Sequence, residues 1–126
     1  MTNEYYDALT PFYKLMYPDW EKSMQRQAKM LDSIFRDYTN GKTETVLDVA
    51  CGIGTQSIGL AKLGYKVSAS DLSPLEVEQA RKEAVDHDVA IDFRAGDMRE
   101  AWMIFQKQFD VVIACDNAIP HLLSDA

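Results

Sequence analysis

The sequence predicts an α/β protein built around a parallel sheet, and three observations support this fold class. Apolar segments alternate with amphipathic ones from residue 44 onward, which is typical of strand–helix–strand units. Segments 45–50 and 109–115 are almost continuously apolar, as strands buried on both faces are. The chain has 126 residues, of which 47% are hydrophobic and 26% charged, which suits one domain with a buried core.

The first 40 residues differ from the rest and predict a helical cap. Aromatic residues are dense between positions 5 and 20 and two prolines interrupt them, which favours short helical turns docked on a larger body. A long helix is expected to begin after Asp19, as its N-cap, and to end at Asn40 and Gly41. Its predicted inward face, at three- and four-residue steps, consists of Met24, Ala28, Leu31, Ile34 or Phe35, and Tyr38.

The predicted sheet opens with a strand, a glycine turn and a helix. Residues 45–50 form the strand and the glycine-rich segment 51–54 turns the chain. A helix over 55–63 follows and Gly64 ends it. The residues of this helix that are expected to point inward are Ile58, Ala61 and Leu63.

The remaining elements repeat this alternation. A strand over 65–70 leads to a helix over 73–86, in which Pro74 takes the first position, where its missing N–H costs nothing. The last expected elements are a strand over 90–94, a helix over 99–106 and a strand over 109–115.

Charge and composition exclude several classes of function. The formal net charge of −7 argues against a nucleic-acid backbone as the principal partner. No apolar run approaches the roughly 18 residues of a membrane span, and the N-terminus lacks a signal layout, so we expect a cytoplasmic protein. Cys51 and Cys115 are far apart and lack zinc-site spacing, so we expect reduced thiols and no metal site.

Acidic residues follow the predicted strands, at the edge where parallel sheets bind ligands. Asp48 lies near the end of the first strand, and Asp71, Asp97 and Asp116 come directly after the other three. Because the carboxyl ends of parallel strands meet at one edge, these four acids are expected to converge there. The sequence therefore predicts an acidic ligand site.

The glycine turn indicates what kind of ligand this site takes. Gly52 and Gly54 would let a ligand approach the main chain closely. Asp71 lies 17 residues beyond Gly54, at the end of the next strand, where an acid accepts hydrogen bonds from a ribose diol in Rossmann-type sites. The alternative is that the glycines only permit close packing and that Asp71 caps the following helix.

A dinucleotide suits this turn poorly. Its fingerprint requires a third glycine where this chain has Ser57, and Asp48 would lie close to the pyrophosphate. Like charges about 4–6 Å apart repel by several kcal/mol at an effective dielectric constant of about 20. A cationic ligand reverses the sign of this interaction, so the sequence favours S-adenosylmethionine.

Residues 46–55, VLDVACGIGT, resemble the first motif of the class I S-adenosylmethionine-dependent methyltransferases. The family pattern is acid-x-Gly-x-Gly-x-Gly, and Ala50 replaces the first glycine. The resemblance spans roughly residues 44–122 and implies a Rossmann-like sheet in the order 3-2-1-4-5-7-6, of which this chain carries the first four strands. It implies a cap over residues 1–40 and a truncated cofactor-binding domain over 41–126.

The same resemblance implies the cofactor contacts. Tyr13 and Tyr17 are further candidates from the cap, with a ring or hydroxyl near the sulfonium, although packing of the cap explains either tyrosine as well. The other contacts are Asp48, Ala50, Cys51, Gly52 and Gly54 for the methionine portion, Asp71 and Leu72 for ribose and adenine, Asp97 and Met98 for the adenine edge, and Asp116 near the sulfonium.

Residues 116–123, DNAIPHLL, resemble the small-molecule branch that includes glycine/sarcosine N-methyltransferase-like proteins. They lack the Pro-Pro-aromatic box of DNA amino-methyltransferases. The implied reaction is in-line methyl transfer to a small amine, in which alignment contributes about 7–11 kcal/mol. Asn117 is implied on the acceptor side, and His121 is the candidate general base, with a structural role at the next helix as its alternative.

A sheet that ends at the fourth strand would have an apolar edge, which natural proteins avoid. We therefore expect a longer protein, or a second copy of the chain, to cover that edge, and weak or absent catalysis by these residues alone. Two other functions remain open. An NAD(P)-dependent oxidoreductase would bind NADH, and a non-catalytic nucleotide-binding module would show no turnover.

Overall fold

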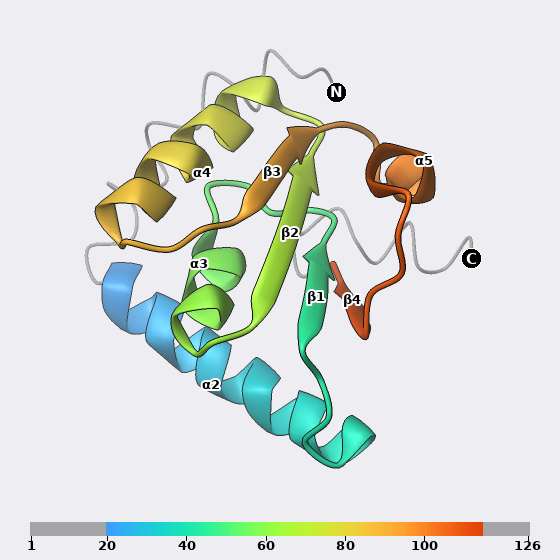
Figure 1. Ribbon diagram of the computed structural model, residues 1–126. Helices are drawn as coiled ribbons and strands as arrows, with labels where there is room; N and C mark the ends of the chain where they lie inside the picture. Colours follow the sequence, from blue (N-terminus) through green and yellow to red (C-terminus); the bar gives the residue numbers. More distant parts are fainter. Residues whose placement is uncertain (1–19, 115–126) are drawn as a thin grey trace.

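A computed structural model of the chain describes residues 20–114. The four strands form one parallel sheet in the order β3-β2-β1-β4. The predicted fold class and strand order are therefore confirmed (Figure 1). In chain order the elements are α2 (Trp20–Thr39), β1 (Thr45–Asp48), α3 (Thr55–Lys62), β2 (Lys66–Asp71), α4 (Pro74–Asp86), β3 (Asp92–Ala95), the 3-10 helix η1 (Met98–Glu100), α5 (Ala101–Phe105) and β4 (Val111–Ile113).

Helices pack against both faces of the sheet, because strand side chains alternate between the faces. Val46 of β1 and Ala69 of β2 point into a core formed with α2, α3 and α4. Leu47 and Val49 point the other way and pack against Phe105 of α5. Figure 1 shows α2, α3 and α4 along one side of the sheet and α5 along the other.

Helix α2 confirms the long helix expected from the sequence and ends where predicted, with Asn40 and Gly41 in the left-handed region. Its inward face was predicted only in part, because Ile34 is 43% exposed and Tyr38 87% exposed. Tyr38 extends past α3, which has eight residues against the twenty of α2. The expected N-cap, Asp19, lies outside the described residues. The buried residues of α2 are Trp20, Met24, Ala28, Leu31 and Phe35.

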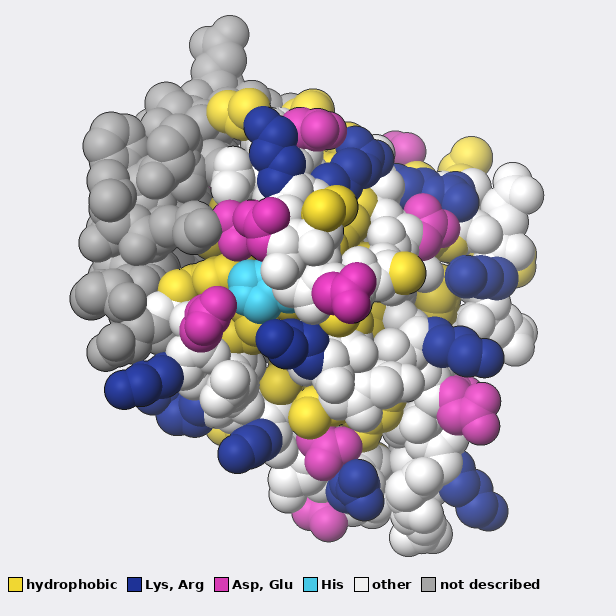
Figure 2. Space-filling view, turned by 60° about the vertical axis from the view of Figure 1, so that its left-hand side comes forward, with side chains coloured by type: hydrophobic (Ala, Val, Ile, Leu, Met, Phe, Trp, Pro, Cys, Tyr) yellow, Lys and Arg dark blue, Asp and Glu magenta, His cyan; other side chains and the backbone are white. Residues whose placement is uncertain are grey.

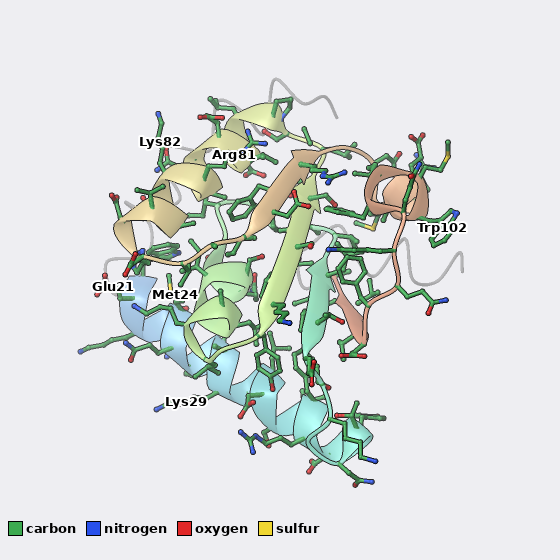
Figure 3. All side chains as sticks on the ribbon, in the orientation of Figure 1. Glu21, Met24, Lys29, Arg81, Lys82 and Trp102 are labelled. Atoms are coloured by element: carbon green, nitrogen blue, oxygen red, sulfur yellow. The ribbon has the colours of Figure 1, made fainter. Side chains whose placement is uncertain are left out.

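Helices α2 and α3 approach each other closely at Gly59. A Cβ atom on Gly59 would lie 2.9 Å from both Ala28 Cβ and the Met24 carbonyl oxygen, closer than real Cβ contacts. Figure 3 shows Met24 between the two helices. Glycine at this position therefore allows α2 and α3 to lie this close together.

Other elements differ from the prediction in detail. Leu63 was expected to point inward but is 47% exposed, because α3 ends one residue earlier. The fourth strand was expected to be buried on both faces, and this is wrong for Val112, which is 60% exposed. Among the described residues, β4 pairs only with β1. The division into a cap and a cofactor-binding domain stays a prediction.

Candidate functional site

The carboxyl ends of β1, β2 and β3 lie together at one end of the sheet (Figure 1). Backbone hydrogen bonds join the loops that leave these strands. Cys51 N donates to Ser70 O at 3.0 Å, and Gly96 N donates to Asp71 O at 2.8 Å. The two loops that follow β1 and β3 are thus both attached to the end of β2.

The glycine turn after β1 requires glycine at two positions, for different reasons. Gly52 and Gly54 have φ angles of 54° and 95°, in the left-handed region that side chains rarely adopt. A Cβ on Gly54 would lie 3.0 Å from Ile58 Cδ1, so Gly54 also serves close packing. On Gly52 the nearest described atom would be Glu76 Oε2, at 4.0 Å. Of the two glycines in the turn, Gly52 is therefore the one around which the described residues leave room for a close approach.

Asp71 joins the turn to the next strand and helix. Its Oδ2 accepts a hydrogen bond from Gly52 N at 2.9 Å, and its Oδ1 accepts one from Ser73 N at 3.0 Å. The side chain is 8% exposed. Ser73, not Asp71, is the N-cap of α4, because its hydroxyl accepts from Glu76 N. Asp71 thus holds two backbone segments in place at the predicted cofactor site.

Asp48 lies beneath the turn and not on the open rim where it was expected. It is completely buried, and its carboxylate accepts hydrogen bonds from Ser57 Oγ at 2.7 Å and Ala50 N at 3.2 Å. Ser57 was considered only as the position of a missing glycine, and its contact with Asp48 was not predicted. The sequence signal that could have indicated the contact was a hydroxyl residue, Ser57, in the first turn of α3, the helix that follows Asp48.

The loop after β3 places Asp97 and Met98 at the start of η1. Asp97 accepts a hydrogen bond from Arg99 N at 2.9 Å and forms an ion pair with Arg99 Nη2 at 2.6 Å. The hydrogen bonds from Arg99 lower the pKa of Asp97 below its usual value. Leu72, predicted beside the adenine, is 56% exposed. The rim therefore carries one basic side chain that the sequence analysis did not include.

Carboxylates surround Cys51 of the turn. Its side chain is 3% exposed, and burial together with the nearby charges of Asp48, Asp71 and Glu76 raises the pKa of the thiol well above its usual value. The thiol therefore stays protonated and does not act as a nucleophile. Glu76, which is 3% exposed on the first turn of α4, was also missed by the sequence analysis.

A separate cavity of about 320 Å³ lies at the opposite end of the sheet. The Tyr65 hydroxyl donates to Asp32 Oδ1 at its wall, and Asp32 also pairs with Arg36 at 2.9 Å. No predicted site residue lines it. Five predicted site residues lie outside the described part of the chain, and their roles stay predictions: Tyr13, Tyr17, Asp116, Asn117 and His121.

Comparison with known proteins places this geometry in a family. The sequence profile of the methyltransferase domain family matches residues 46–126. A ubiquinone biosynthesis O-methyltransferase of Xanthomonas axonopodis pv. citri is 29% identical over 126 residues, which covers 96% of this chain and 52% of that protein. Its Xanthomonas oryzae counterpart is 30% identical over 102 residues, covering 78% of this chain and 42% of that protein. The chain thus spans about half the length of these relatives.

Solved structures show the same arrangement. Streptomyces venezuelae DesVI has a TM-score of 0.73 at 26% identity, and the match covers 86% of this chain and 43% of DesVI. CalS10 is an amino pentose methyltransferase from Micromonospora echinaspora solved with bound S-adenosylmethionine. It has a TM-score of 0.69 at 25% identity, and the match covers 84% of this chain and 42% of CalS10. With its parallel sheet, its glycine turn and these matches, the chain belongs to the methyltransferase domain family, among the class I S-adenosylmethionine-dependent methyltransferases.

Proposed function

We propose that this chain forms the cofactor-binding part of a methyltransferase that uses S-adenosylmethionine and acts on a small-molecule acceptor. One observation carries the proposal: the Asp71 carboxylate holds Gly52, the open position of the turn, at the end of the next strand. This places an acid and a bare stretch of main chain side by side. A nucleoside with a ribose diol requires that combination.

Charge favours S-adenosylmethionine over a dinucleotide. The carboxylates of Asp48, Asp71 and Glu76 are close enough to raise the pKa of Cys51. A pyrophosphate at the turn would meet this negative potential, whereas a sulfonium would be attracted by it. Arg99 offers little compensation, because it is paired with Asp97.

The residues of this chain would bind the cofactor and orient its methyl group, since methyl transfer depends mainly on the alignment of the reacting groups. When bound, S-adenosylmethionine supplies a methyl carbon that its sulfonium already activates. Asp71 would accept from the ribose hydroxyls, because an ionised carboxylate accepts about four hydrogen bonds and the two backbone donors use part of that capacity. Leu72 and Met98 would contact the adenine, and Gly52 would admit the methionine portion.

For the acceptor we propose an amine, with a hydroxyl as the competing class. The segment around Asn117 and the similarity to the amino pentose methyltransferase CalS10 support an amine. The name of the Xanthomonas relatives supports a hydroxyl. On the face shown in Figure 2 acidic and basic side chains are interspersed, which suits a small molecule better than a nucleic acid. Within residues 20–114, no helix is long and apolar enough to cross a membrane.

The test is calorimetric titration with S-adenosylhomocysteine of the parent chain, an Asp71→Asn variant and an Asp110→Asn control. Asp110 also accepts two backbone N–H groups, from Glu44 at 2.8 Å and Thr45 at 3.0 Å, but at the opposite end of the sheet. Asp71→Asn should lose more stability than Asp110→Asn, because Asp71 is buried and Asp110 is exposed, so the titrations are run where both variants are folded. Only Asp71→Asn should lose affinity, by about tenfold or more, which is the loss of about one charge-assisted hydrogen bond.

Equal affinities of the two variants would refute the assignment of Asp71. Binding of NADH in place of S-adenosylhomocysteine, followed by fluorescence, would replace the proposal with an oxidoreductase. Methyl transfer assays with paired amine and hydroxyl acceptors would decide the acceptor class, since only one class should be methylated.

A further inference from the structure

We propose that Trp20, at the start of α2, is a positioning residue for the cofactor-binding turn, acting through a hydrogen bond to Thr55. The inference rests on the proposed function, because it concerns the same turn. Trp20 Nε1 donates to Thr55 Oγ1 at 2.9 Å, across 35 positions of sequence. Thr55 is the first residue of α3 and directly follows Gly54.

The start of α3 is attached to α2 by this contact, and its own sequence provides no side-chain cap. Gly54 occupies the N-cap position in the left-handed region and has no side chain with which to bond the first turn. The hydroxyl of Thr55 is held instead from outside, by the indole of α2. A second side-chain bond, from Gln56 Nε2 to Gln27 Oε1, attaches the next residue to the same helix.

Packing places Trp20 against the turn as well as against α3. Trp20 is 6% exposed and belongs to the same buried cluster as Cys51 and Ile53. The position of α2 is itself fixed by its close contact with Gly59. The turn is thus supported by α2, which cannot shift without disrupting the core. Trp20 is the residue of α2 that bonds to Thr55 at the end of the turn.

This arrangement has a consequence for ligand affinity. A turn that samples other conformations binds more weakly in proportion to the fraction that is competent to bind. One neutral hydrogen bond corresponds to about a fivefold change in such an equilibrium. Removing the indole N–H should therefore weaken S-adenosylhomocysteine binding by up to about fivefold, and by less the more strongly the parent turn favours the competent conformation.

The experiment compares Trp20→Phe, Thr55→Val and the double variant by calorimetric titration with S-adenosylhomocysteine, and Thr55→Ser tests rescue. Each single variant should lose affinity measurably, by up to about fivefold, the double variant should lose no more than either single one, and Thr55→Ser should bind like the parent. The control is Trp102→Phe, the same change at a tryptophan that is 66% exposed on α5 (Figure 3). Its affinity should equal that of the parent.

A second readout uses the Trp102→Phe chain, in which Trp20 is the only tryptophan left of the two in the sequence. Its emission should change when S-adenosylhomocysteine is added. Parent-like binding by Trp20→Phe and Thr55→Val, or losses that multiply in the double variant, would overturn the inference while leaving the Asp71 result intact. If Trp20→Phe does not fold, Thr55→Val and Thr55→Ser decide alone. A parent chain that binds no S-adenosylhomocysteine would refute the proposed function and this inference together.

Discussion

Replacing Ser57 with alanine should destabilise the fold by removing a donor from a buried charge. Both Ser57 and Asp48 have no exposed surface, and the serine hydroxyl donates to Asp48 Oδ2 at 2.7 Å. The alanine variant keeps the Cβ and loses only the hydroxyl. Water cannot replace it without entering the space beneath the turn, so the carboxylate loses one of its stabilising contacts.

The size of the effect follows from the charge of the acceptor. Hydrogen bonds to charged groups contribute about 1.5–3 kcal/mol, so we expect the free energy of unfolding to fall by about 2 kcal/mol. With a urea m value of about 2 kcal/mol/M, the unfolding midpoint should fall by about 1 M. The m value should not change, since the amount of surface exposed on unfolding is the same.

Ser70→Ala is the matched control. Ser70 is equally buried, but its Oγ has no hydrogen-bond partner among the described residues. Removing that hydroxyl relieves an unsatisfied polar group, so the urea midpoint should stay constant or rise. The assignment of a strong hydrogen bond from Ser57 to Asp48 would be refuted if the urea midpoint of Ser57→Ala lay within about 0.2 M of the parent. It would also be refuted if Ser70→Ala lowered the midpoint by the same amount as Ser57→Ala.

Two further predictions use the pKa shifts. Burial and the bond to Asp32 raise the pKa of Tyr65 to about 12, above the value of about 10 of an unfolded chain. The stabilisation by Tyr65 is therefore complete below pH 10 and lost as the pH rises toward 12. Urea unfolding should show a loss of about 2 kcal/mol over this range in the parent but not in Tyr65→Phe. In a Cys115→Ser chain, Cys51 should react with iodoacetamide at pH 8 at least about tenfold more slowly in the folded protein than in the urea-unfolded protein, because burial raises the pKa of its thiol. Equal reaction rates in the two states would contradict a buried thiol.

The fold could be predicted because its signals are local. β1 lies in a short, largely apolar run, a glycine lies two residues beyond the end of both α2 and α3, and Ser73 with Pro74 starts α4 where predicted. Gly52 and Gly54 could be recognised because a left-handed turn leaves few other residues possible. These features depend on a few neighbouring residues and not on the rest of the chain.

The errors arise where the outcome depends on the length of a neighbouring element. Tyr38 continues the helical repeat of α2 correctly but is 87% exposed among the described residues, because α3 ends before it could lie opposite Tyr38. Val112 is apolar and exposed, because among the described residues no strand beyond β4 continues the sheet. Periodicity shows which way a side chain points, and it does not show whether anything lies opposite.

The missed site residues share another cause. Ser57 and Glu76 are polar residues on helices and would ordinarily be exposed, but both are buried beside the turn. The partner that makes such burial acceptable lies on a different element, as Asp48 does for Ser57. Pairings of this kind follow from the arrangement of the elements in space. For Ser57 the sequence contained only an indirect signal, a hydroxyl residue in the first turn of the helix that follows Asp48.

The two backbone bonds of Asp71 also bear on how this surface can change over evolutionary time. The Asp71 carboxylate bonds to Gly52 of the turn and to Ser73, the residue before α4. A mutation of Asp71 that changes ligand specificity at the proposed cofactor site therefore also removes two structural contacts. A lineage that drifts toward a different nucleoside must either keep the acid or replace both contacts at once. Diversification is therefore easier at exposed Leu72, whose substitution leaves those contacts in place.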